Sequence, residues 1–164
     1  MRKLTIIGVL VVALTMVLTV PAMAAAPTLH KATGGGGILW GPDEIFVNYA
    51  FTAQQVNELG DAKGEFVIQS RDADPDLRLK ADILYLAVDG NKAWMGGVIT
   101  QSNADGYPVG DGMIFEVIDN GQGSKAAGPD WTSVIWVGGD PAEALSMPSW
   151  LWGFDFVKGN IQVS

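Results

Sequence analysis

The chain has 164 residues, with 21 glycines, one histidine and no cysteine, and its 10 basic and 18 acidic residues give a net charge of −8. The lack of cysteine excludes disulfides, thiolate metal sites and a cysteine nucleophile. The single histidine, His30, argues against histidine-clustered metals and a Ser-His-Asp triad. The acidic excess disfavours nucleic acids and anionic membrane surfaces as partners, because both repel a negatively charged protein.

The N-terminal segment has the pattern of an export signal. Arg2 and Lys3 precede an apolar run over residues 4–20, and Ala22-Met23-Ala24 supplies the small residues of a cleavage site. We expect residues 1–24 to be a signal peptide that is removed after Ala24. Residues 25–164 are then a single secreted, extracellular β domain without a membrane anchor. The alternative is a retained anchor, because the apolar run has the minimum length of a spanning helix.

Strand-like runs, each bounded by glycine, proline, aspartate or asparagine, follow along the rest of the chain. In the second run, Ile45, Val47, Tyr49 and Phe51 alternate with polar residues, which is typical of a half-buried strand. No stretch of ten residues keeps a helical period, although residues 52–59 and 142–145 could form short helical turns. The predicted strands span residues 31–40, 43–52, 64–71, 77–88, 92–101, 112–118, 131–137 and 154–163.

The run over residues 77–88 changes its alternation midway. Leu77, Leu79, Ala81 and Ile83 share one parity, whereas Leu84, Leu86 and Val88 share the other. Such a switch predicts a β-bulge, or a strand covered on both faces. The Asp89-Gly90 pair that follows predicts a tight hairpin, because both residues tolerate a positive φ. We therefore expect an all-β fold, an antiparallel meander of about eight strands closing into a small β-barrel; the alternative is a two-sheet β-sandwich.

Several of these segments resemble a known family. They are residues 88–100, residues 115–124 with Asp130 and Ser133, the glycine-rich opening at residues 32–36 and the ending at residues 159–163. Together they resemble a family of small secreted bacterial proteins, described as hypothetical exported proteins or as post-COAP-type domains of larger extracellular proteins. The resemblance implies a secreted β domain and assigns no reaction.

The acidic turn Asp72, Asp74 and Asp76 is a candidate metal site, because calcium binds clusters of carboxylate oxygens. The EF-hand pattern fails, since Leu77 replaces the loop glycine and Ile83 the bidentate glutamate. We expect a solvated hairpin turn, with calcium binding as the alternative.

The glycine-rich loop at residues 119–124 is not followed by a helix start, and Ser124 and Lys125 stand in the wrong order for a phosphate cradle. We expect a structural loop in which Asp119 and Asp130 accept backbone N–H groups.

Six tryptophans raise the possibility of a carbohydrate or apolar ligand, because aromatic rings stack on sugars and line pockets. Trp150 and Trp152 form the densest patch and would share one face of a strand. The alternative is that these side chains fill the core or cover an open end.

No catalytic constellation stands out, and the sequence implies no cofactor. Our hypothesis is a non-enzymatic exported β-barrel module with an interaction or small-ligand-binding role, whose partner is an unidentified extracellular ligand or protein. The alternative is a barrel-type enzyme, similar to an isomerase or cyclase, that uses an interior pocket. Large apolar side chains at every inward position would favour the module, and polar residues converging on a cavity would favour a ligand site or an enzyme.

Overall fold

The computed structural model describes residues 29–73, 76–122, 126–149 and 151–164. The predicted signal peptide, Asp74 and Trp150 therefore lie outside the described residues. Within the described ranges, no helix has the length and apolar character needed to cross a membrane.

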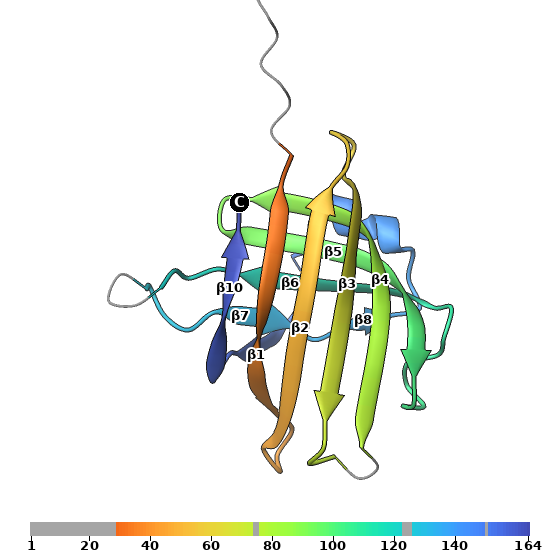
Figure 1. Cartoon of the computed structure of the whole chain (residues 1–164), viewed down its shortest axis with the longest axis vertical. Coiled ribbons are helices and arrows are strands. Elements are labelled where there is room, and N and C mark those ends of the chain that lie inside the picture. The colour runs from red at the N-terminus through yellow and green to blue at the C-terminus, as the bar shows by residue number, and fades with distance from the viewer. Residues whose placement is uncertain (1–28, 74–75, 123–125, 150) are drawn as a thin grey trace, which may run out of the picture.

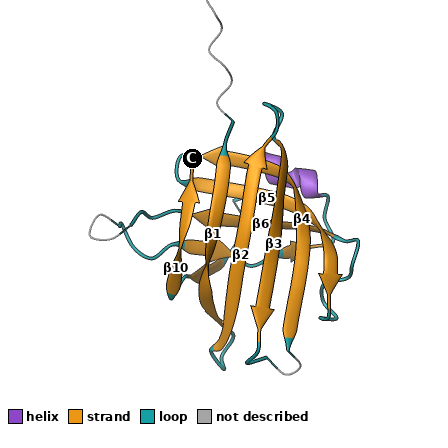
Figure 2. Ribbon diagram, in the orientation of Figure 1, coloured by secondary structure: helices purple, strands orange, loops and turns teal. Residues whose placement is uncertain are grey.

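The prediction of an all-β fold is confirmed, and Figure 2 shows strands over most of the described chain with one short helix, η2 (Pro141–Ser146). The strands are β1 (Lys31–Trp40), β2 (Ile45–Gln55), β3 (Asp61–Ser70), β4 (Leu77–Asp89), β5 (Lys92–Ser102), β6 (Gly112–Ile118), β7 (Trp131–Ser133), β8 (Trp136–Val137), β9 (Gly153–Asp155) and β10 (Lys158–Val163).

These strands form one antiparallel sheet in the order β10-β1-β2-β3-β4-β5-β6-β7-β9, with β8 pairing with β6. In Figure 1, β1 to β4 form the near wall and β5 and β6 cross behind them, so the sheet is strongly curled. The rings of Phe51 and Phe66 on the near wall contact Phe115 of β6, with centroids 5.8 and 4.6 Å away. The core thus lies inside the curl, as the predicted barrel or sandwich requires.

The predicted bulge in β4 is present. The pairing of β4 with β5 shifts between Lys80 and Ala81 and again between Ile83 and Tyr85. Burial changes parity at the second shift, since Ile83 and then Leu86 face the core. Leu84, which we expected to join the apolar face, lies at the shift and is 41% exposed. A bulge leaves one residue without a partner, and here that residue faces solvent.

The predicted hairpin after β4 is also present. Asp89 pairs with Lys92, so Gly90 and Asn91 are the central residues of the turn. Gly90 has a φ of 60°, and Asn91 does not have a positive φ. Glycine at the first central position is the requirement of a type II′ turn, so the hairpin forms with one left-handed residue rather than two.

The expected helical turns at 52–59 and the two undivided strands near the C-terminus need correction. Residues 52–59 do not form helical turns, because β2 continues to Gln55, whose N–H donates to the His30 carbonyl and whose side-chain amide donates to the Leu86 carbonyl. The run at 131–137 divides into β7 and β8, and the run at 154–163 divides into β9 and β10. The helical turn expected at 142–145 is confirmed, as part of the 3-10 helix η2.

Glycines in β1 let aromatic rings lie close to the strand. A Cβ at Gly34 would lie 2.6 Å from the Phe51 ring, and a Cβ at Gly36 would overlap the Phe156 ring and the Lys158 carbonyl oxygen. Since β1 pairs with both β2 and β10, these glycines allow the core to fill up to the backbone of the strand. Larger side chains there would push β1 outward.

Two carboxylates bind the outer edge of β10, where the ladder stops. Asp130 accepts the Ile161 N–H at 2.6 Å and the Asn120 N–H at 2.9 Å. Asp119 accepts the Val163 N–H at 3.2 Å and the Gly121 N–H at 2.9 Å. The expectation that both aspartates accept backbone N–H groups of the loop is confirmed. The structure adds that they also link this loop to β10, so side chains close the curl where strand pairing does not.

Candidate functional site

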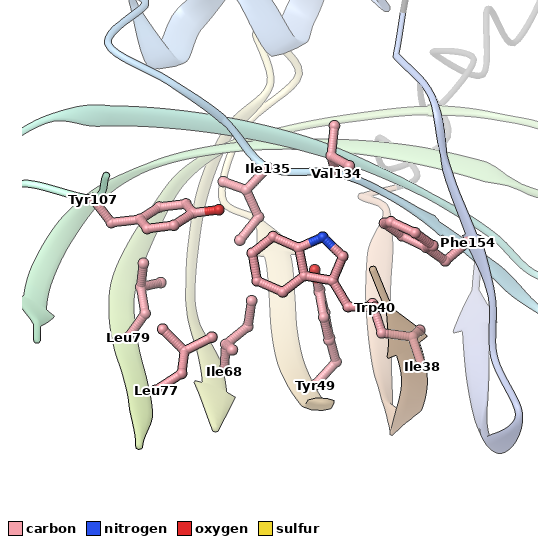
Figure 3. Close-up of a pocket in the computed structure, with 10 residues that line it drawn as sticks. All are labelled: Ile38, Trp40, Tyr49, Ile68, Leu77, Leu79, Tyr107, Val134, Ile135 and Phe154. Carbon is pink, nitrogen blue, oxygen red and sulfur yellow. The ribbon is translucent and has the colours of Figure 1, made fainter. Parts of the chain in front are cut away.

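An apolar pocket lies at the end of the core where β1 ends and β4 begins. Six aliphatic side chains line it: Ile38, Ile68, Leu77, Leu79, Val134 and Ile135. Four aromatic side chains complete the lining: Trp40, Tyr49, Tyr107 and Phe154 (Figure 3). The cavity volume is about 20 Å³, which is space for about one water molecule. The pocket is therefore nearly closed in this conformation.

Strand alternation explains why these residues meet. Successive inward positions of β1 carry Gly36, Ile38 and Trp40, and those of β4 carry Leu77 and Leu79. Tyr49 in β2 pairs with Ile68 in β3, so the two side chains leave the sheet on the same face. The near wall thus supplies most of the lining, and the link between β7 and β8 covers it from the opposite side (Figure 3).

Tyr49 places a polar atom in this apolar space. The residue is 6% exposed, and its ring packs edge-on against Phe66 at 5.5 Å and Phe156 at 6.2 Å. Its hydroxyl makes no hydrogen bond to another described residue. No fully buried side-chain polar atom of the described chain lacks a partner. The hydroxyl of Tyr49 is therefore not sealed in the core but reaches the space of the pocket that the ring lines.

Tyr107 supplies a second hydroxyl from the loop between β5 and β6. The residue is half-buried, and its N–H donates to the Ala104 carbonyl at 3.1 Å. Its hydroxyl points into the pocket, toward Ile135 and Trp40, in the view of Figure 3. Burial raises the pKa of both phenols, and the neighbouring Tyr107 raises the pKa of Tyr49 further. Both hydroxyls therefore stay neutral hydrogen-bond donors at physiological pH.

Tryptophans surround the mouth of the pocket. Trp40 lines it while remaining 37% exposed. Trp152, one of the two candidate ligand-binding residues, is 65% exposed, and its ring lies 5.9 Å from that of Phe154. The Val134 N–H donates to the Trp152 carbonyl at 2.7 Å and fixes the backbone there. Trp152 thus lies beside the pocket rather than in it, and Trp150 is outside the described residues.

The described lining carries no carboxylate, ammonium, guanidinium or imidazole group. None of the side chains that line the described pocket is acidic, basic or a histidine. Carboxylates and imidazoles, the commonest general acids and bases, are therefore absent from this lining. The residues present can bury an apolar molecule and donate or accept hydrogen bonds through two phenols.

Glu116 is a separate buried carboxylate, on the outer face of β6 opposite Trp94. Its side chain is 7% exposed and lies 3.8 Å from the Lys92 Nζ. Burial raises the pKa of Glu116, and the Lys92 ammonium partly opposes that rise. Its backbone N–H donates to the Ser133 Oγ at 2.8 Å. Glu116 is absent from the lining of the pocket, so it does not contribute chemistry there.

In the described part of the acidic turn, backbone groups of the aspartates bond to neighbouring side chains. Asp72 and Asp76 are exposed. The Asp72 N–H donates to the Ser70 Oγ at 3.3 Å, and the Asn103 side-chain amide donates to the Asp76 carbonyl at 2.5 Å. Among the described residues, no three acidic, histidine or cysteine side chains are grouped so that they could hold a metal ion. Because Asp74 is not described, the solvated turn stays a prediction, with calcium binding as its alternative.

Sequence reasoning missed Tyr49, Tyr107 and Trp40 as site residues. The alternation of β2 correctly assigned Tyr49 to the inner face, but it could not show that the hydroxyl lacks a partner. Tyr107 lies in a polar loop with no periodic signal, and only the fold brings it over the end of the core.

Comparisons with protein-family models, with curated proteins and with solved structures found no match. The family resemblance therefore remains a prediction.

Proposed function

We propose that this chain is a non-enzymatic exported β module that binds a small apolar ligand in the pocket between Trp40 and Tyr107. The observation that carries the proposal is the Tyr49 hydroxyl, which is held in an apolar pocket without a hydrogen-bond partner among the described residues. The hydroxyl reaches the space of the pocket and is bonded by no described residue, so it is available to a bound molecule.

The filled core supports a module over the barrel-type enzyme. Large side chains such as Phe66, Phe115 and Met95 occupy inward positions and are fully buried. A barrel-type enzyme that works with a carboxylate or a histidine would need that group in its pocket, and none lines this one among the described residues.

Entry of a ligand requires the mouth to open. The Trp40 indole makes no hydrogen bond to another described residue, and Tyr107 belongs to a loop. Rotation of these two side chains would join the cavity to solvent without breaking the sheet. The ligand would then be held mainly by burial of apolar surface, which contributes about 25 cal/mol per Å².

Ethylbenzene is a suitable probe, because it is small, neutral and apolar. Its binding can be followed by methyl NMR, where saturable shifts are expected at Ile38, Ile68 and Leu79. Val134→Phe fills the pocket and should abolish these shifts. Val109→Phe makes the same change at an exposed loop position and should leave them intact. Shifts that are absent, or that persist in Val134→Phe, would contradict the proposal.

Export is proposed from the pattern of residues 1–24. The N-terminal sequence of material recovered outside the producing cell should begin at Ala25. An intact Met1 on a membrane-bound protein would instead support the retained anchor.

A further inference from the structure

The polar chemistry of the pocket restricts its ligand. We infer that the ligand is a neutral apolar molecule with one carbonyl oxygen, which accepts a hydrogen bond from the Tyr49 hydroxyl inside the pocket. The inference rests on the proposed function, since it concerns the ligand of the same site. It follows from which groups face the pocket and which do not.

The carbonyl is favoured by the unpaired donor. The Tyr49 ring is fixed by edge contacts with Phe66 and Phe156, so its hydroxyl is held at one position of the pocket wall. The other lining groups, apart from Tyr107, are hydrocarbon surfaces or the Trp40 indole. A pure hydrocarbon ligand would cover the Tyr49 hydroxyl and leave it without a partner. A carbonyl oxygen would satisfy it, and the Tyr107 hydroxyl can reach the same space.

A charged ligand is disfavoured by the same lining. No lysine, arginine or histidine lines the described pocket to pair with a carboxylate, and no acidic residue lines it to pair with an amine. Burying an unpaired charge among aliphatic side chains is far more costly than burying a neutral carbonyl. The raised pKa values of both tyrosines reflect the same resistance of the site to charge.

Three probes of similar shape separate these possibilities: acetophenone is a neutral ketone, ethylbenzene lacks the oxygen, and benzoate is an anion. Affinities measured by calorimetry or NMR titration should fall in that order. Tyr49→Phe removes only the hydroxyl and should lower the affinity for acetophenone roughly three- to tenfold, which corresponds to one neutral hydrogen bond. The affinity for ethylbenzene should stay the same or rise. Tyr85→Phe removes a phenol outside the lining and should change neither affinity.

The outcomes distinguish this inference from the proposed function. If ethylbenzene binds as tightly as acetophenone and Tyr49→Phe changes neither affinity, the inference of a carbonyl in the ligand is wrong, whereas the proposed apolar binding site is supported. Tighter binding of benzoate would also overturn the neutral ligand class. If none of the probes binds, the proposed function itself fails. Tyr49→Phe should keep the urea midpoint of the wild type, because the fold does not use the hydroxyl; a clear loss of stability would overturn the inference.

Discussion

Replacing Asp130 by alanine should destabilise the fold strongly, because this carboxylate joins two segments at the edge of β10. Both of its oxygens accept backbone N–H groups, from Ile161 at 2.6 Å and from Asn120 at 2.9 Å. The residue is 7% exposed and Ile161 is fully buried, so water cannot easily replace the lost partner.

The expected magnitude follows from these two bonds. A hydrogen bond to a charged group contributes about 1.5–3 kcal/mol, so losing both should lower the free energy of unfolding by about 3–6 kcal/mol. Domains are typically stable by about 5–15 kcal/mol, so the variant should lose a large share of its free energy of unfolding. Asp119→Ala should cost less, about 1–2 kcal/mol, because its bond to the Val163 N–H is longer and its bond to Gly121 is exposed.

Urea unfolding followed by tryptophan fluorescence measures these differences. Asp155→Ala is the matched control, because this aspartate is exposed on β9 and its carboxylate has no partner within the described chain. It should change the free energy of unfolding by less than about 0.5 kcal/mol. If Asp130→Ala unfolds at the same urea midpoint as Asp155→Ala, the carboxylate does not stabilise the edge of β10 and the reasoning fails.

Other substitutions test the strand, the turn and the buried carboxylate. Gly36→Ala should lower the urea midpoint sharply, because the added Cβ would overlap neighbouring backbone. Gly35→Ala should be tolerated, because its Cβ would lie 3.6 Å from the nearest atom. Similar midpoints for the two variants would refute the packing argument. Gly90→Val should cost about 1–3 kcal/mol, because φ is 60° there, and Gly106→Val, at an open position without a positive φ, should cost much less in the same assay. Because burial raises the pKa of Glu116, the folded state binds this proton more tightly than the unfolded state. The contribution of Glu116 to the free energy of unfolding therefore falls as pH rises above about 4.5. Glu116→Gln should therefore gain stability relative to the wild type between pH 4 and pH 7.5, and a constant difference between the two proteins would contradict the raised pKa.

Local alternation predicted the fold class and several details of the sheet. The parity switch between Ile83 and Leu84 correctly indicated the bulge, and Asp89-Gly90 correctly indicated the hairpin. Both signals are local, because they depend on side chains within a few residues of one another. The bounds of β1 and β6 were predicted for the same reason.

The divided strands could not be predicted, because long-range bonds divide them. Between β7 and β8, the Ser133 hydroxyl takes the Glu116 N–H that a continuous strand would have bonded, and the Val134 N–H turns to Trp152. Between β9 and β10, the Phe156 N–H bonds to the Asp130 carbonyl and the Val157 N–H to Gly37. The sequence around 131–137 and 154–163 carries no glycine or proline at these breaks.

The pocket could not be predicted from the sequence for a related reason. Its parts come from β1 to β4, from β9, from a loop and from the β7–β8 link, and each looks like an ordinary core or loop residue in the sequence. What identifies the site is the unpaired Tyr49 hydroxyl, which is a property of the packed structure. Trp152 was found from the clustering of tryptophans, but the sequence placed it in the site, whereas its ring lies beside Phe154 at the rim.

The pairing of the first and last strands has a mechanical consequence. Lys31 and Ser164 exchange two backbone hydrogen bonds, and Ala32 lies opposite Val163. The start of β1 therefore lies beside the end of β10. A force that pulls residues 31 and 164 apart would load these bonds one after another, as in a zipper, rather than all together in shear. The Asp119 contact at Val163 would break before the Asp130 contact at Ile161. Tension between the two ends should therefore peel β10 away in steps at low force while the curled sheet behind it stays folded.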